Sequence, residues 1–281
     1  MPRCGVVIFV TDLSMQPAEL AIAVEERGLD SLFVTEHTHI PTNSKSPFLP
    51  GGEVPEHYRR TYDPFVALGA AAAVTKRIAL GTGICLVSQR DPITLAKEVA
   101  TLDRMSNGRF IFGIGAGWNK PEVENHGTPF DQRWAILRER ILAMKVIWSE
   151  EHPEFHGDHV NFDPMLSYPK PVQAGGPPIW IGANSKYVAE RIAEYADGWL
   201  PIGGRDGGAD IEAVAAACEA RGRSIDDIVM ALFFPPMDVG ECRAKVDEGY
   251  SEFIFALPSA PADEVLVELD KIAKISDELR A

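Results

Sequence analysis

One β–α–β unit occupies residues 78–115, with the sequence IALGTGICLVSQRDPITLAKEVATLDRMSNGRFIFGIG. It opens on the apolar run Ile78–Gly83 and closes on the apolar run Phe110–Gly115. Both runs are typical of strands that are buried on both faces. Between them, Asp91 offers an N-cap carboxylate just before a proline that suits the first turn of a helix. Apolar residues then recur at the spacing of one helical face: Leu95, Val99 and Leu102. The stretch predicts two parallel strands joined by a crossover helix.

The same alternation of strand and helix extends in both directions from this unit. Six more apolar runs read as buried strands: Val6–Val10, Ser31–Thr35, Ile179–Gly182, Gly198–Ile202, Ile228–Phe234 and Phe253–Leu257. Asp63 before Pro64 marks another helix start. Two further helical faces follow from apolar spacing: Trp134, Leu137, Ile141 and Trp148, then Leu266, Leu269, Ile272 and Leu279. Eight such repeats predict an α/β fold, a closed (βα)8 TIM barrel, with a doubly wound open sheet as the main alternative.

The chain has the length of one α/β barrel, so we expect a single domain over residues 1–281. Two connections are longer than usual and read as insertions, one after the second strand (His37–Tyr62) and one after the fourth helix (Glu150–Pro178). In a barrel, loops that follow strands lie over the active-site end. The first insertion is therefore a candidate lid or substrate wall.

Composition favours a small-molecule enzyme. A formal charge of −14 argues against a nucleic-acid partner. We expect a cytoplasmic protein without membrane attachment, because no apolar run is long enough to span a bilayer and the N-terminal run is too short for a signal peptide. The four cysteines have no CxxC spacing, which indicates buried reduced thiols.

Glycines gather where two of the predicted strands end. Three alternate in Gly113–Gly117, and two close the run at Gly81 and Gly83. Such glycines let a ring or a polar tail approach the backbone closely, although a tight turn or a bulge explains them equally well. The candidate cofactor-binding residues in these segments are Gly81, Gly83, Ile84, Gly115, Ala116 and Gly117.

A second candidate cofactor segment, Gly182–Ser185, stands between a strand and a helix. It contains Gly182, Ala183, Asn184 and Ser185. Backbone N–H groups at a helix start bind phosphate, and Lys186 in the first turn would suit an anion there. A plain N-cap with an exposed lysine is the alternative. An anionic cofactor on so acidic a chain also needs local cations, for which the candidates are Arg90, Arg59, Arg60 and Lys186.

Glu36 and His37 end the second strand, which brings a carboxylate and an imidazole to the active-site end. They are the candidate catalytic residues, with His37 as acid, base or hydrogen-bond donor. We do not expect a metal site, because Glu36, His156 and His159 form no recognised ligand set.

Taken together, these segments resemble the luciferase-like oxidoreductase family, and in particular its actinobacterial F420-dependent branch. The matching stretches are VTEHTHIP at residues 34–41, the long run from Tyr62 to Asn119, YPKPVQ and PPIWIGANS between Tyr168 and Ser185, and ADGWLP at residues 196–201. The resemblance covers roughly the first three-quarters of the chain.

The resemblance implies a cofactor ring at the carboxyl ends of the strands and a cis peptide without proline at Gly83–Ile84. It also implies the cofactor phosphate at Gly182–Ser185 and a role for His37 in proton transfer or orientation. Where F420-dependent sugar-phosphate dehydrogenases carry a catalytic glutamate, this chain has Trp118. An aromatic wall of Trp118, with Tyr62 as a second pocket residue, suits an apolar or planar substrate.

We therefore expect hydride transfer between the deazaflavin coenzyme F420 and a small organic substrate. Two alternatives stay open, namely a monooxygenase that uses reduced FMN and a flavin-binding protein without catalysis. Relatives often form dimers through barrel helices, so a homodimer is an alternative to a monomer.

Overall fold

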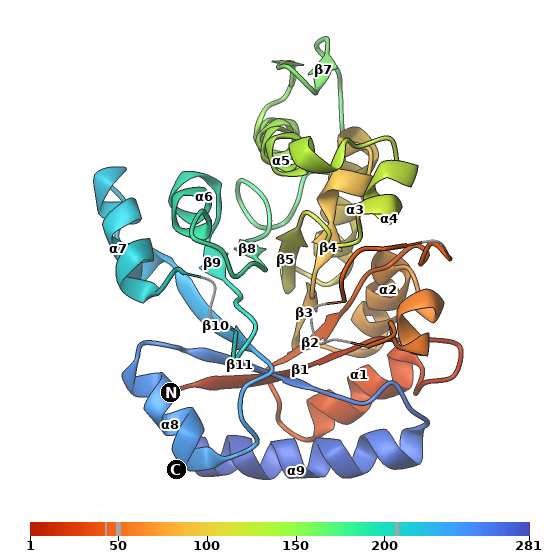
Figure 1. Cartoon of the computed structure of the whole chain (residues 1–281), viewed down its shortest axis with the longest axis vertical. Coiled ribbons are helices and arrows are strands. Elements are labelled where there is room, and N and C mark those ends of the chain that lie inside the picture. The colour runs from red at the N-terminus through yellow and green to blue at the C-terminus, as the bar shows by residue number, and fades with distance from the viewer. Residues whose placement is uncertain (43, 49–51, 206–207) are drawn as a thin grey trace.

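The computed structural model describes residues 1–42, 44–48, 52–205 and 208–281. Within these ranges, eight parallel strands form a closed barrel (Figure 1). The strands are β1 (Arg3–Ile8), β2 (Ser31–Val34), β3 (Ala79–Thr82), β5 (Phe110–Gly115), β8 (Ile179–Ile181), β9 (Gly198–Trp199), β10 (Val229–Phe233) and β11 (Glu252–Ala256). Pairing of β3 with β5 closes the ring, so the predicted barrel is confirmed and the open sheet is wrong.

Helices surround the barrel, and their starts follow the sequence signals. They are α1 (Pro17–Glu26), α2 (Pro64–Val74), α3 (Pro92–Met105), α4 (Lys120–Asn125), α5 (Arg133–Ser149), α6 (Val188–Tyr195), α7 (Ile211–Ala220), α8 (Val239–Asp247) and α9 (Ala262–Arg280). The Asp63 carboxylate accepts hydrogen bonds from two backbone N–H groups of α2, and the Asp91 carboxylate accepts one from α3. Both predicted N-caps are confirmed.

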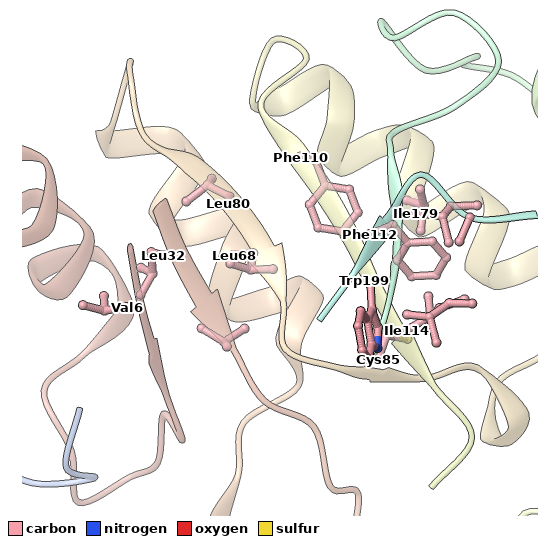
Figure 2. Packing of buried hydrophobic residues seen from close by; sticks show 14 of the residues in the cluster. Val6, Leu32, Leu68, Leu80, Cys85, Phe110, Phe112, Ile114, Ile179 and Trp199 are labelled. Atoms are coloured by element: carbon pink, nitrogen blue, oxygen red, sulfur yellow. The ribbon is translucent and has the colours of Figure 1, made fainter. Parts of the chain in front are cut away.

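Successive strand residues alternate between the barrel interior and the helices. Residues that face outward fill one core, and Figure 2 shows part of it: Val6, Leu32, Leu80, Phe110 and Ile179. Their inward neighbours form a second cluster inside the barrel, which includes Val7, Phe33, Ile111, Trp180 and Ile254. All four cysteine side chains are buried and free, as expected.

Both predicted insertions are present. The first contains η1 (Glu56–Arg60), and residues 43 and 49–51 of it lie outside the described ranges. The second follows α5 and contains the hairpin of β6 (Phe155–His156) and β7 (Asn161–Phe162), which projects at the top of Figure 1. Glu139 of α5 holds this hairpin by accepting hydrogen bonds from the backbone of residues 158–160.

The remaining short elements are the strand β4 (Cys85–Leu86) and the turns η2 (Val87–Gln89), η3 (Phe130–Gln132) and η4 (Ile225–Asp227). Strand β4 lies just beyond β3 and pairs with the end of β5. The peptide between Gly83 and Ile84, which joins β3 to β4, is cis, as the resemblance implies.

Candidate active site

A buried histidine–carboxylate pair lies at the carboxyl ends of the barrel strands. His37 follows β2, is 7% exposed, and its Nδ1 lies 2.8 Å from Oε2 of Glu122. Glu122 lies in the first turn of α4 and is fully buried, and its Oε1 accepts a hydrogen bond from the Thr38 backbone N–H. An ionised carboxylate only accepts hydrogen bonds, so Nδ1 of His37 carries the proton in this pair.

Trp118 contacts the other side of the same imidazole. Its indole N–H donates to Nε2 of His37 at 3.4 Å. Since an indole N–H is only a donor, Nε2 acts as the acceptor here. The two hydrogen bonds therefore assign one tautomer to His37, with the proton on Nδ1 and the acceptor lone pair of Nε2 directed at the Trp118 N–H.

Aromatic rings form a wall next to this pair. Tyr58 lies 5.1 Å from His37 and 6.4 Å from Trp118 between ring centroids. Phe48 lies 5.8 Å from Trp118, and Phe9 lies 4.5 Å from Tyr58. Each of these rings except His37 is half-buried, so the wall is accessible to a small molecule. Burial raises the pKa of Tyr58, against the opposing charge of Arg205.

Tyr62, which the sequence suggests as a pocket residue, does not contact this wall. Its backbone N–H donates to the Val10 carbonyl and its side chain packs partly against the outer core. Tyr58 and Phe48 take the expected part instead. Sequence reasoning missed both, although the insertion that holds them was identified as a candidate wall.

Glu36 points away from His37 into an ionic cluster. One of its oxygens accepts from the Leu86 N–H at 2.6 Å, and the other lies 2.7 Å from Nε of Arg90. Arg90 also pairs with Asp63 and Glu98, at 2.6 and 3.1 Å. Burial alone would lower the pKa of Arg90, but the Glu36 carboxylate raises it well above its usual range.

This cluster corrects two expectations. The carboxylate oxygens of Glu36 bind Arg90 and the Leu86 backbone N–H. Glu36 is therefore not a member of the pair that His37 forms with Glu122. Arg90 has three carboxylate partners, and it is not a free cation for a cofactor anion. Arg59 and Arg60 are likewise paired with Glu56, and Arg60 also with Asp12.

The strand-end glycines make room for protein atoms. A Cβ at Gly113 would lie 1.9 Å from the Thr82 carbonyl oxygen, and one at Gly81 would overlap the ring of Phe33. A Cβ at Gly115 would lie 1.8 Å from Cδ1 of Ile84. The expected close approach of a cofactor is thus not needed to explain these glycines.

Ile84 occupies the slot between two strand ends, since a Cβ at Gly182 would also meet its side chain. Ile84 is half-buried and follows the cis peptide. Gly117 has a φ of 79°, which favours glycine, and turns the chain toward α4 while Ala116 is buried. The Ile84 side chain therefore fills the space that the glycines leave at these strand ends.

The Gly182–Ser185 segment retains the features of an anion site, with one correction. Helix α6 begins at Val188, so a turn of residues 185–187 separates the segment from the helix. Asn184 does not cap the helix, because its amide holds the loop after β9 through Ile202 and Arg205. The Oγ atom of Ser185 is buried without a hydrogen-bond partner in the described part of the chain.

Two cationic residues belong to the segments around Ser185. Lys186 follows it directly, and its Nζ lies over the Tyr187 ring. Arg205 is held by Asn184 through its carbonyl, and its charge acts on Tyr58. Sequence reasoning missed Arg205, which lies in a Gly-rich loop without a periodic signal. A buried hydroxyl without a partner and cationic residues in the adjoining segments are chemically compatible with a phosphate group.

A polar network lies on the outer side of His37. Thr38 Oγ1 lies 2.8 Å from both Nδ1 of His39 and Nε2 of His126, and Asn125 lies 2.8 Å from Nε2 of His39. Burial lowers the pKa of His126. This network links the first insertion to α4, and so helps to fix Glu122 opposite His37.

Comparisons with known proteins agree with this fold. The family model described as luciferase-like monooxygenase matches residues 16–280. A protein of uncharacterised function from Mycobacterium tuberculosis (strain H37Rv) is 36% identical over 274 residues, which is 96% of each chain. An F420-dependent glucose-6-phosphate dehydrogenase from Amycolatopsis mediterranei is 30% identical over 224 residues, covering 75% of this chain and 61% of that one.

Solved structures of low sequence identity share the fold. The monooxygenase RslO1 from Streptomyces bottropensis superposes with a TM-score of 0.78 at 20% identity, covering 99% of this chain and 100% of its own. An F420-dependent secondary alcohol dehydrogenase, solved with an F420-acetone adduct, gives a TM-score of 0.76 at 18% identity, with 100% and 99% covered. In the part of this chain that the structure describes, no helix has the length and apolar character needed to cross a membrane.

Proposed function

Because the chain belongs to the luciferase-like monooxygenase family, a family of oxidoreductases, we propose that it transfers a hydride between coenzyme F420 and a small organic substrate. The observation that carries the proposal is the orientation of His37 between Glu122 and Trp118. Nε2 of His37 lies beside the aromatic wall, and it can take up or return a substrate proton once a substrate displaces the long 3.4 Å hydrogen bond from Trp118. The bound cofactor supplies the hydride acceptor or donor.

The residues divide into three roles. Ser185, Lys186 and Arg205 hold the phosphate of the cofactor, which the unpartnered Ser185 hydroxyl and the two cations support. Ile84, which fills the space between Gly115 and Gly182 at the strand ends, would contact the ring. Ala116, Gly117, Gly182 and Ala183 shape the backbone around it.

The wall of Trp118, Tyr58 and Phe48 excludes water and orients the substrate. A large aromatic surface with few charges suits an apolar or planar substrate that bears one oxidisable or reducible group. A sugar phosphate is disfavoured, since this chain has Trp118 where the resemblance places the catalytic glutamate of sugar-phosphate dehydrogenases.

Proton transfer at His37 follows from its tautomer. In the oxidation of an alcohol, Nε2 of His37 would take the proton of the substrate hydroxyl, while bound F420 would supply the hydride acceptor. The positive imidazolium that results is stabilised by the buried Glu122 carboxylate at Nδ1. Reduction runs the same steps in reverse.

The test is turnover of reduced F420 with a panel of aromatic and aliphatic carbonyl compounds. We expect His37→Asn to lower turnover at least 100-fold while F420 affinity changes little. The matched control is His156→Asn, since His156 is exposed on the distant β6–β7 hairpin. Equal turnover of the His37 variant and the intact protein would remove the proton-transfer role.

A monooxygenase that uses reduced FMN is the second candidate, because the same phosphate site suits FMN. Oxygen consumption with reduced FMN, and none with reduced F420, would favour it. A protein that binds either cofactor and transfers no hydride to any compound would be a flavin-binding protein without catalysis. Whether the chain forms a homodimer affects none of these tests.

A further inference from the structure

A cavity lies at the opposite end of the barrel from His37. It has a volume of about 330 Å³ and is lined by residues that begin the strands, among them Arg3 of β1, Trp180 of β8 and Glu252 of β11. Arg77 and Arg109, which precede β3 and β5, also line it. This end of the barrel has no part in the proposed function.

One donor in this cavity has no acceptor. Trp180 is 2% exposed, and its Nε1 has no hydrogen-bond partner among the described residues. An indole N–H can only donate, and a buried donor without a partner is unfavourable. The ring itself is fixed, since it stacks on Phe33 at 5.7 Å between centroids. An acceptor inside the cavity would complete this site.

Glu252 provides a second buried polar atom without a hydrogen-bond partner among the described residues. One of its oxygens lies 3.0 Å from Nη1 of Arg3, while Oε2 is buried without a partner in the described chain. Burial raises the pKa of Glu252 to about 7, although Arg3 opposes the shift, and Asp30 adds to it. Near neutral pH, Oε2 therefore carries a proton for part of the time and becomes a second donor without an acceptor.

The charge of the cavity favours an anion as that acceptor. Three arginines line it, and Glu252 is the only acidic residue among its lining residues in the described chain. The N–H groups of Arg109 donate to backbone carbonyls and to Thr75 Oγ1. Arg109 therefore contributes positive charge to the cavity but no free donor that an anion could use. Asp30, which also acts on Glu252, is paired with Arg280. On a chain with a formal charge of −14, such a local excess of cations is unusual.

We propose that this cavity binds a small oxyanion, such as a carboxylate, sulfate or phosphate, between the Trp180 indole N–H and the Arg3 and Arg77 guanidinium groups. The carboxyl group of Glu252 contributes a donor when it is protonated. Water alone would satisfy the indole, whereas an oxyanion would also interact with the guanidinium groups of Arg3 and Arg77, which otherwise contact Glu252 and the Glu25 carbonyl. The cavity volume suits a ligand of this size or a larger molecule with such an end.

The test is calorimetric titration of the intact protein with sodium sulfate, acetate and phosphate in buffers matched with chloride. We expect saturable binding of one oxyanion per chain, and the relative heats show which type is preferred. Trp180→Phe, which keeps the ring and removes the N–H, and Arg3→Gln should each weaken binding roughly tenfold. Arg27→Gln is the matched control, because Arg27 pairs with Asp270 on the outer surface.

A pH series with sulfate tests the part played by Glu252. Affinity should fall as the pH rises from about 6 to 8, as the donor becomes a carboxylate that repels the anion. Glu252→Gln keeps a donor at both pH values, so its affinity should stay nearly constant. The charged and titratable groups around Glu252 are Arg3, Arg77, Arg109, the Asp30–Arg280 pair and the Cys4 thiol, whose pKa burial raises to about 11.

Three results would overturn the proposal. They are absence of saturable binding, binding that Trp180→Phe and Arg3→Gln both leave unchanged, and binding that is lost in Lys186→Ala instead. The last result would assign the anion to the Ser185 segment at the other end of the barrel. Because F420 titration probes only that other end, failure of this proposal leaves the proposed function intact.

Discussion

Nδ1 of His37 lies 2.8 Å from Oε2 of Glu122, although 85 residues separate the two in the chain. His37 follows the strand β2, Glu122 lies in the short helix α4, and both side chains are buried. A carboxylate in this relation to an imidazole fixes its tautomer and stabilises its protonated form. Glu122 is therefore a positioning residue, which acts on the substrate only through His37.

Glu122→Gln should lower turnover about 10- to 100-fold while the affinity for F420 stays nearly constant. The amide carries no charge to stabilise the imidazolium, so the acid limb of the pH profile of kcat/KM should move to lower pH. A separate check is the ¹⁵N spectrum of labelled histidine, in which His37 should show a protonated Nδ1 in the intact protein. A signal from a protonated Nε2 would contradict the assigned tautomer.

Gly115→Ala should destabilise the fold by about 1–3 kcal/mol, because the added Cβ would lie 1.8 Å from Cδ1 of Ile84. Ile84→Val removes that atom, so the double variant should recover most of the loss. Urea unfolding of the four proteins of this cycle measures the coupling. Additive losses would mean that Ile84 does not fill the slot.

Gly113→Ala serves as the harsher comparison. Its Cβ would lie 1.9 Å from the Thr82 backbone carbonyl, which cannot rotate away. We expect a larger loss of stability than for Gly115→Ala, and no rescue by Ile84→Val. Rescue would indicate that the backbone of β3 moves more freely than its pairing with β5 suggests.

Arg90→Met should cost about 3 kcal/mol of unfolding free energy, because it leaves the buried Glu36 carboxylate without its charged partner. Glu36→Gln in the same chain should restore part of that stability. Binding of F420 by the folded fraction should be unchanged in both variants. If F420 binding weakened while the free energy of unfolding stayed unchanged, Arg90 would instead be a cofactor-binding residue.

Stability should fall as the pH rises from about 5 to 8, in a way that depends on Glu252. Burial raises the pKa of Glu252 from 4.5 to about 7 in the folded chain, so the folded state binds more protons than the unfolded state between these values. The protonated Glu252 side chain makes its full contribution to the free energy of unfolding below about pH 4.5. This contribution, up to about 3 kcal/mol, is lost as the pH rises past 7. Denaturation of Glu252→Gln should show a smaller fall, and an equal fall would contradict the assignment.

Local signals explain which features were predictable. Each buried strand has an apolar run and each of the helices α2 and α3 has its own N-cap, so the barrel followed from the sequence. His37 was predicted because it ends a strand, and the cis peptide because of a family resemblance. These features depend on near neighbours in the chain or on relatives.

Features that depend on distant contacts were missed. An acidic residue in the first turn of a helix ordinarily stabilises the helix dipole, so nothing in the sequence marked Glu122 as the partner of His37. The strand-end glycines were assigned to cofactor approach, whereas their space is filled by Ile84, Phe33 and a backbone carbonyl. Glu36 was predicted to be catalytic because it stands next to His37 at the end of a strand. Adjacent side chains of an extended chain point to opposite sides, and Glu36 contacts Arg90 while His37 contacts Glu122.

The most direct test of the central claim is titration of the intact protein with F420 and, separately, with FMN, followed by Trp118 fluorescence and compared with Trp118→Phe. The account predicts tight binding of F420 and weak binding of FMN. It also predicts that Lys186→Ala weakens F420 binding roughly tenfold and more strongly at low salt. Preference for FMN, or binding of neither cofactor, would contradict the account.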